Sequence, residues 1–178
     1  MAATFEFEED NGTQTGSPTK GTTRTAARTE NNWKNVDDST TAYSSSPIVA
    51  GNNSFDKWQF GHFSGTYNQI LNGKWAHTAG TLGTGLTLKG KVAPSGGYTT
   101  PATTANANLS TDMTSSIAIG SGATVQFGAT GPEASGKANS TTSNPAYSDW
   151  LTTQLQTTGS AAAGDTATVT LTLQYDEN

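Results

Sequence analysis

The sequence predicts an all-β protein, an antiparallel β-sandwich or jelly-roll-like domain with an extended N-terminal arm. Short runs of alternating apolar and polar residues recur along the chain, and turns rich in Gly, Ser and Asn separate them. The chain has 33 Thr and 20 Gly among its 178 residues, a composition that favours strands and turns. No run shows helical periodicity, so we expect a sandwich of short strands.

The first segment, residues 1–12, is expected to be an N-terminal strand. Thr4-Phe5-Glu6-Phe7-Glu8 alternates with a period of two, so both phenylalanines share one face and the carboxylates share the other. An acidic turn over residues 8–12 should end the strand. A calcium site is not expected there, because the segment lacks the alternate ligands and the closing Glu of an EF-hand loop.

The second segment, residues 13–46, is predicted to be an extended polar arm. Its large apolar residues are Trp33, Val36 and Tyr43, which are too few to form a core of their own. We expect contact with a neighbouring subunit to offset the entropy lost when the arm becomes ordered. Trp33 and Tyr43 are the predicted partner-binding anchors, because large aromatic side chains concentrate binding energy in otherwise polar contacts.

The third segment, residues 47–178, is expected to form the β-sandwich domain. The aromatic run from Phe55 to Tyr67 indicates a strand that carries a bulge or is covered on both faces. Asn72-Gly73 predicts a two-residue hairpin turn before Trp75.

Further strands follow, and the last is the clearest because Val169, Leu171, Leu173 and Tyr175 alternate with Thr and Gln. Strands are predicted at residues 86–92, 117–119, 125–127, 149–156 and 168–175, with a turn at 94–97 and polar loops at 99–110 and 131–144. The apolar members of the alternating runs form the predicted core: Phe5, Trp58, Phe60, Leu86, Leu88, Val125, Leu155, Val169, Leu171 and Leu173.

The composition also bounds the possible partners. Ile, Leu, Val and Phe together supply only 24 of 178 residues, so we expect a lean core that association into a homo-oligomer completes. A pI near 4.8 and scattered Lys and Arg disfavour nucleic acid. The chain has no apolar run long enough to span a membrane and no basic, apolar start, so neither a membrane nor a secretory signal is expected.

Residues that could carry chemistry are few, and we expect no catalytic, cofactor-binding or metal site. The chain has no Cys and two His, and Gly61 to Gly65 misses the spacing of a serine nucleophile elbow by one position. His62 and Ser64 share a face, but a hydrogen-bonded or surface histidine is the ordinary interpretation. The Gly-rich stretch 80–85 lacks the Lys-Ser/Thr ending of a phosphate loop and predicts a turn. The expected protein is therefore not an enzyme.

One aromatic group has two interpretations. If exposed, it would be a sugar-stacking platform, and if buried, it would be the core; the shortage of aliphatic residues favours the core. The group consists of Trp58, Phe60, Phe63, Tyr67 and Trp75.

Three strings resemble structural proteins of tailed-phage virions. They are AGNNSFDKW at residues 50–58, FSGTYNQI at 63–70 and TLTLQYDE at 170–177, and the likeness spans residues 50–178 without the N-terminal arm. The resemblance implies synthesis in the host bacterial cytoplasm, incorporation into a virion and no catalytic residue.

Within that setting we expect a capsid decoration, or cement, protein on the capsid surface. Such a protein binds the assembled lattice of the major capsid protein and stabilises it, since binding to one state shifts the equilibrium toward that state. The alternatives are a head–tail connector, a tail component, or a module that binds host glycans.

Overall fold

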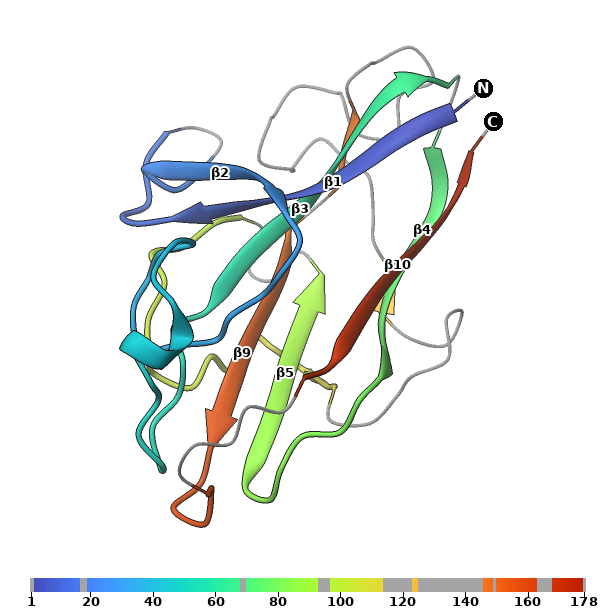
Figure 1. The fold of residues 1–178 in the computed structure, drawn as a ribbon. Helices are drawn as coiled ribbons and strands as arrows, with labels where there is room; N and C mark the ends of the chain where they lie inside the picture. The colour runs from blue at the N-terminus through green and yellow to red at the C-terminus, as the bar shows by residue number, and fades with distance from the viewer. Residues whose placement is uncertain are drawn as a thin grey trace.

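The computed structural model describes residues 2–16, 19–67, 70–92, 97–113, 123–124, 146–148, 150–162 and 168–177. Within them the chain is nearly all β, and a seven-stranded antiparallel sheet packs against a three-stranded sheet (Figure 1). The one helix among these residues is a single 3₁₀ turn, η1 (Tyr43–Ser45). The predicted fold class, an all-β sandwich, is confirmed.

The larger sheet has the strand order β2-β1-β3-β9-β5-β6, and β8 also pairs with β3. The smaller sheet has the order β10-β4-β7. Both ends of the described chain lie side by side, where the Ala3 N–H donates to Glu177 Oε2 at 2.8 Å (Figure 1). The strands are β1 (Ala2–Asn11), β2 (Thr23–Arg28), β3 (Lys57–Thr66), β4 (Ile70–Ala79), β5 (Leu86–Val92), β6 (Thr111–Asp112), β7 (Ala123–Thr124), β8 (Ala146–Tyr147), β9 (Leu151–Thr157) and β10 (Thr170–Glu177).

Several predicted strands are confirmed within a few residues of their ends. The strands expected at 86–92, 149–156 and 168–175 are β5, β9 and β10. The loop expected at 99–110 contains no strand. The expectations for 94–96, 117–119, 125–127, 131–144 and Asp149 lie outside the described residues.

The predicted hairpin turn at Asn72-Gly73 is wrong, because both residues lie inside β4. The chain changes sheets between Thr66 and Ile70, since β3 belongs to the larger sheet and β4 to the smaller one. β4 then pairs with β10 along nearly its whole length, for example through Trp75 and Leu173. Pairing with a distant strand has overridden the local turn preference.

The hydrophobic core lies on both faces of β3, as the aromatic run predicted. Between the sheets, Phe63 and Leu88 are buried against partly buried side chains of β10. On the other face, Trp58 and Phe60 pack edge-on against Trp150, with ring centroids 5.6 and 5.3 Å apart. Of the predicted core, Trp58, Phe60 and Leu88 are buried, Phe5, Leu86, Leu155, Val169, Leu171 and Leu173 are partly buried, and Val125 lies outside the described residues.

The aromatic group is therefore core and not an exposed platform. Trp58, Phe60, Phe63 and Tyr67 are all buried. The side chain of Trp75 lies outside the described part of the chain. These four residues therefore do not form an exposed surface on which a sugar could stack.

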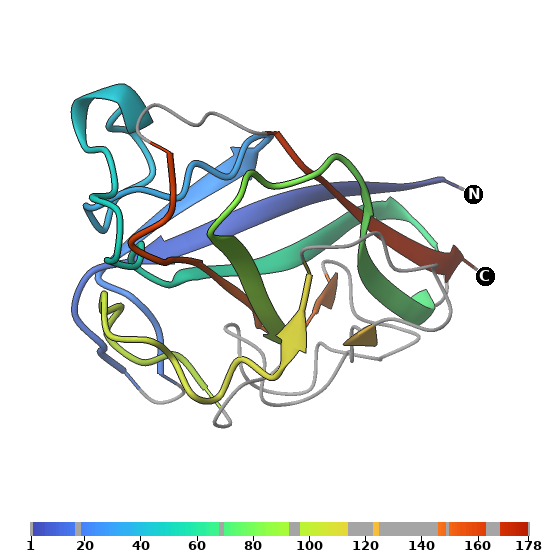
Figure 2. The same ribbon diagram turned by 90° about the horizontal axis from the view of Figure 1, so that it is seen from below.

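The expectation of an extended arm at residues 13–46 needs correction. The described part of this segment folds back on its own domain, because β2 pairs with β1 and the Phe55 N–H donates to the Lys34 carbonyl at 3.2 Å. The segment with η1 and the loop 97–110 lie on opposite sides of the larger sheet (Figure 2). Polar and charged contacts within the chain, rather than a core of aliphatic side chains, hold the segment in place.

The interior of the described chain contains many polar and charged residues beside its few aliphatic ones. Buried polar and charged residues outnumber buried hydrophobic ones in the described chain, 14 against 11. Hydrogen bonds and ion pairs must therefore supply partners for these buried polar groups. The Glu9 carboxylate and the Lys57 ammonium group, 0% and 2% exposed, lie 2.8 Å apart. The acidic turn expected at residues 8–12 is instead the end of β1, and Glu8, Glu9, Asp10 and Asn11 are buried.

Candidate functional site

A cleft of about 440 Å³ opens between the start of β10 and the segment that follows β2. Phe7, Gln59 and Leu155, from the adjacent strands β1, β3 and β9, line its base. Val169, which directly precedes β10, and Leu171, in β10, line its other side. The cleft is thus built from both sheets and from the folded-back segment.

A bulge in β2 places Arg28 in this cleft. Thr25 pairs with Glu9, but the next pair along the strands is Arg28 with Phe7, so β2 carries an additional residue between them. Ala27 takes up the bulge with a left-handed φ of 52°. Because side chains alternate along a strand, the bulge directs Arg28 rather than Ala27 to the face that Glu9 and Phe7 share.

Two buried polar atoms of the cleft lack a hydrogen-bond partner among the described residues. Arg28 Nη2 donates to the Glu30 carbonyl at 3.2 Å, but Arg28 Nε makes no hydrogen bond and lies 3.8 Å from Glu9 Oε2. Asn31 Nδ2 donates to Gln59 Oε1 at 2.6 Å, but Asn31 Oδ1 has no donor. Both atoms are shielded from solvent, so neither is presented to the open cleft although their residues line it.

Trp33 and Tyr43, the two predicted partner-binding residues, both line this cleft. Trp33 is partly buried against the core, and its Nε1 donates to Thr153 Oγ1 at 3.1 Å. Tyr43 lies in η1 and its side chain is 48% exposed. The structure brings these residues together, whereas their contact with a partner stays a prediction.

Two buried lysines fix the segment that carries these residues through their contacts with Asp38. Lys34 Nζ donates to Asp38 Oδ1 at 2.6 Å, and Lys57 Nζ donates to the Asp38 carbonyl at 2.9 Å. Desolvation acts to raise the pKa of Asp38, but hydrogen bonds from Lys34 and Thr41 outweigh it and hold that pKa well below its ordinary value. Asp38 is therefore ionised at neutral pH and remains a partner for Lys34.

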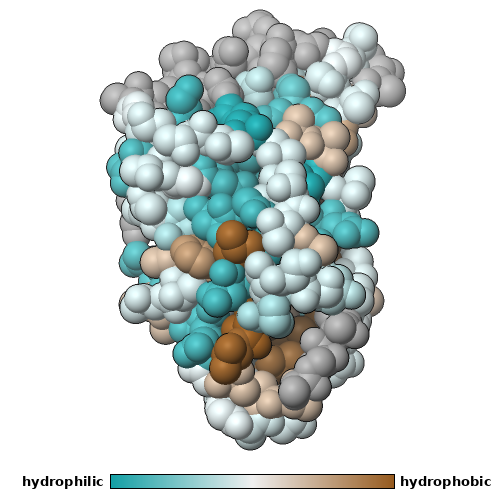
Figure 3. All heavy atoms as spheres, turned by 60° about the vertical axis from the view of Figure 1, so that its left-hand side comes forward, coloured by the Kyte–Doolittle hydropathy of each residue, from teal (hydrophilic) through white to brown (hydrophobic). Residues whose placement is uncertain are grey.

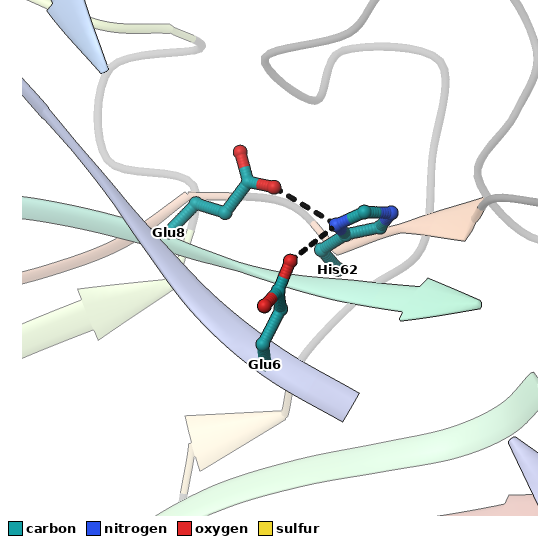
Figure 4. A group of neighbouring side chains, drawn as sticks. All are labelled: Glu6, Glu8 and His62. Atoms are coloured by element: carbon teal, nitrogen blue, oxygen red, sulfur yellow. Dashed lines mark hydrogen bonds and ion pairs between the residues drawn. The ribbon is translucent and has the colours of Figure 1, made fainter. Parts of the chain in front are cut away.

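A second cluster joins Glu6, Glu8 and His62 on the opposite face of β1 and β3. The register pairs Glu6 with His62, and both carboxylates point at the imidazole (Figure 4). His62 Nδ1 lies 3.0 Å from Glu6 Oε1 and 2.8 Å from Glu8 Oε1, and the ring stacks on Tyr147 at 4.8 Å. Burial, and then the charge of Glu8, raise the pKa of Tyr147.

This cluster could in principle hold a divalent cation, since zinc accepts imidazole and carboxylate ligands and the three donor atoms lie within 4.8 Å of one another. The neighbouring Arg24 already brings positive charge, because its Nε lies 3.9 Å from Glu8 Oε2 and 2.8 Å from Asp10 Oδ1. The arrangement is that of an ion-pair network, and we assign no metal to it.

The remaining candidates from the sequence do not assemble into a site. His62 directs its Nδ1 at two carboxylates, which fits the hydrogen-bonded histidine that the sequence favoured over a dyad with Ser64. His77 is buried in β4, with Nε2 2.7 Å from the Ala79 carbonyl, and so belongs to the other sheet. The stretch 80–85 forms the turn before β5, as predicted.

Sequence reasoning missed Arg28, Asn31 and Gln59, which supply the polar groups of the cleft. They come from β2, the following loop and β3, so no local motif connects them. The string RTENNW at residues 28–33, in which polar residues with planar end groups precede a tryptophan, is the signal that could have drawn attention to the loop.

Comparison with protein-family models, with curated proteins and with solved structures gave no match. Among the residues that the structure describes, no helix is long and apolar enough to cross a membrane.

Proposed function

We propose that this chain is a non-enzymatic structural protein of a tailed-phage virion, a capsid decoration protein that binds the assembled lattice of major capsid protein. The observation that carries the proposal is an exposed pair of apolar side chains on one loop. Tyr43 is 48% exposed and Val49 is 63% exposed. They are the exposed large hydrophobic residues of the described chain.

The loop with this pair is held in a fixed position, which suits a docking element. The Asn35 N–H donates to the Ser46 carbonyl at 2.9 Å, and the buried Lys34 ties the start of the segment to Asp38. A preorganised loop loses little conformational entropy on binding, so more of the contact energy becomes affinity. The side of the molecule with η1 is otherwise largely hydrophilic, with apolar groups in small separate spots (Figure 3).

A small docking surface suits a protein that is present in many copies on a lattice. Each copy that binds assembled subunits better than free ones stabilises the shell by mass action. If the chain is also a homo-oligomer, as its lean aliphatic content predicts, several docking loops act together and raise the effective affinity. The proposed location is the outer capsid surface, after synthesis in the host cytoplasm.

The test is reconstitution on phage particles that lack this chain. Purified protein with Val49→Asp should leave about tenfold fewer copies on washed particles than the wild type, because a charge in the centre of an apolar contact is costly. Ser45→Ala, an exposed change in the same loop, is the matched control and should bind like the wild type.

Two outcomes would overturn the proposal. Equal occupancy of the Val49→Asp and wild-type proteins would show that the loop is not the attachment device. Labelled protein found at the neck or tail rather than over the capsid faces would favour the head–tail connector or tail component instead.

A further inference from the structure

We propose that Lys57 and Asn11 form an intramolecular isopeptide bond between β3 and β1, with Glu9 transferring the protons. The bond joins Lys57 Nζ to Asn11 Cγ and releases ammonia. It gives a chain that has no cysteine a covalent link inside its larger sheet. The proposal does not depend on the proposed function, because all three residues are buried inside this one chain.

The sheet register places the two reacting side chains opposite each other. Asn11 ends β1 and Lys57 begins β3, and the antiparallel pairing of these strands runs up to Asp10 with Trp58. One further step in the same register sets Asn11 against Lys57, and directly opposite residues have Cβ atoms about 4.5–5.5 Å apart. Glu9 precedes Asn11 by two residues, so its side chain lies on the same face.

A single carboxylate oxygen connects the two nitrogens of the reaction. Glu9 Oε1 accepts hydrogen bonds from Lys57 Nζ at 2.8 Å and from Asn11 Nδ2 at 3.0 Å. The nucleophile and the leaving group thus share one acceptor, which can take a proton from the first and give it to the second. Asp37 Oδ1 also accepts from Asn11 Nδ2, at 2.9 Å, so the leaving nitrogen lies between two carboxylates that favour its departure as ammonium.

Burial favours the reaction and suppresses its competitor. Glu9, Lys57 and Asn11 are 0%, 2% and 4% exposed. Because separate charges are poorly solvated in the interior, proton transfer from Lys57 to Glu9, which gives a neutral amine and a neutral acid, costs less there than in water. A hydrogen bond of 2.9 Å to the Asp38 carbonyl holds Lys57 Nζ in place. The exclusion of water also protects the Asn11 amide from hydrolysis.

The reaction balances without a further reactant. The Lys57 ammonium group gives a proton to Glu9, and the neutral Nζ attacks Asn11 Cγ with its lone pair. The new C–N bond forms and the Cγ–Nδ2 bond breaks, with its electron pair staying on Nδ2. Glu9 passes two protons in turn from Nζ to Nδ2, so ammonium leaves, one proton stays on the new amide, and Glu9 ends as a carboxylate.

The test is mass spectrometry of the purified full chain, intact and after trypsin. The intact chain should be lighter than its sequence by about 17 Da, the mass of ammonia. Trypsin should not cleave after the uncharged Lys57 amide, so peptide 1–20 should stay joined to peptide 35–74. Separate peptides after prolonged incubation at neutral pH would overturn the proposal. A loss of ammonia confined to peptide 1–20 would indicate a succinimide at Asn11-Gly12 and would overturn it too.

Variants identify the role of each residue. Lys57→Arg, which keeps the charge, and Asn11→Ala should each abolish the link. Lys89→Arg, the same change at a partly exposed lysine paired with Asp112, is the matched control and should keep it. Glu9→Asp withdraws the carboxylate and should slow linking at least about tenfold, because a small displacement of a catalytic group is costly.

A rate of linking in Glu9→Asp equal to that of the wild type would overturn the role of Glu9 in proton transfer. Circular dichroism checks that each variant folds. The joined peptides are sought in the wild-type chain itself, so the proposal stays falsifiable even where a variant does not fold. Chains that have not reacted keep the Glu9–Lys57 ion pair.

Discussion

Replacing Glu9 by Gln should destabilise the protein strongly, because it leaves Lys57 charged inside the fold. The two groups are 0% and 2% exposed, and Lys57 Nζ lies 2.8 Å from Glu9 Oε1. Glu9 also accepts a hydrogen bond from Asn11 Nδ2 at 3.0 Å and lies 3.8 Å from Arg28 Nε. A neutral amide cannot balance the Lys57 ammonium group, which also donates a hydrogen bond to the Asp38 carbonyl at 2.9 Å.

The expected magnitude follows from the burial of both partners. Removing one member of a fully buried ion pair costs about 3–5 kcal/mol, because the desolvated charge that remains has no counter-charge. Asn11 retains Asp37 as an acceptor at 2.9 Å, so its amide adds little to the loss. With an m-value of roughly 2 kcal/mol/M, the urea midpoint should fall by about 1.5–2.5 M.

Urea unfolding followed by tryptophan fluorescence measures this change. Glu30→Gln, the same chemical change at an exposed carboxylate, is the control and should shift stability by less than about 0.5 kcal/mol. The double variant Glu9→Met with Lys57→Met removes both charges and should recover most of the loss. A loss below about 1 kcal/mol for Glu9→Gln would refute the view that this pair secures the interior.

The remaining predictions concern a glycine in the turn before β5 and the titration of Asp38. Gly80→Ala should cost at least about 1 kcal/mol more than Gly51→Ala, measured by urea unfolding. A Cβ at Gly80 would collide with the Thr168 carbonyl, whereas a Cβ at Gly51, with a nearly equal φ of 88°, would meet the Gly159 nitrogen at an ordinary contact distance of 3.9 Å. Equal losses would show that the collision at Gly80 is not the cause. The lowered pKa of Asp38 means that its stabilisation is present above the unfolded pKa, about 3.8, and is lost as pH falls below it. Asp38→Asn should therefore lower the urea midpoint at pH 7 and reduce its decline between pH 5 and pH 2, and an unchanged decline would contradict this role.

Strand patterns were predictable where they depend only on neighbouring residues. The alternation of Val169, Leu171 and Leu173 with threonines identified β10, because one face of this strand packs on the core. The Asn72-Gly73 turn failed for the opposite reason. The geometry of this segment is set by its pairing with β10, about a hundred residues away along the chain. The local preference of Asn-Gly for a turn cannot reveal such a distant pairing.

The cleft was predictable only in part. Trp33 and Tyr43 stood out as aromatic residues in a polar segment, and both line it. Arg28 reaches the cleft through the bulge at Ala27, and such an irregularity shows no clear trace in composition or periodicity. The fold-back of the segment depends on contacts such as those of Lys34 and Lys57 with Asp38, and sequence alone does not reveal which of these groups meet.

The buried lysines determine where the proposed capsid-binding loop lies in this chain with few aliphatic residues. Aliphatic side chains can fill a core in several arrangements, but a buried ammonium group is stable only where particular acceptors surround it. Lys34 and Lys57 both contact Asp38, so the two lysines and this aspartate restrict the segment to one placement. That placement sets Tyr43 beside the cleft and Val49 on the exposed loop. Variants that loosen these contacts should therefore weaken capsid binding, even though they do not alter Tyr43 or Val49.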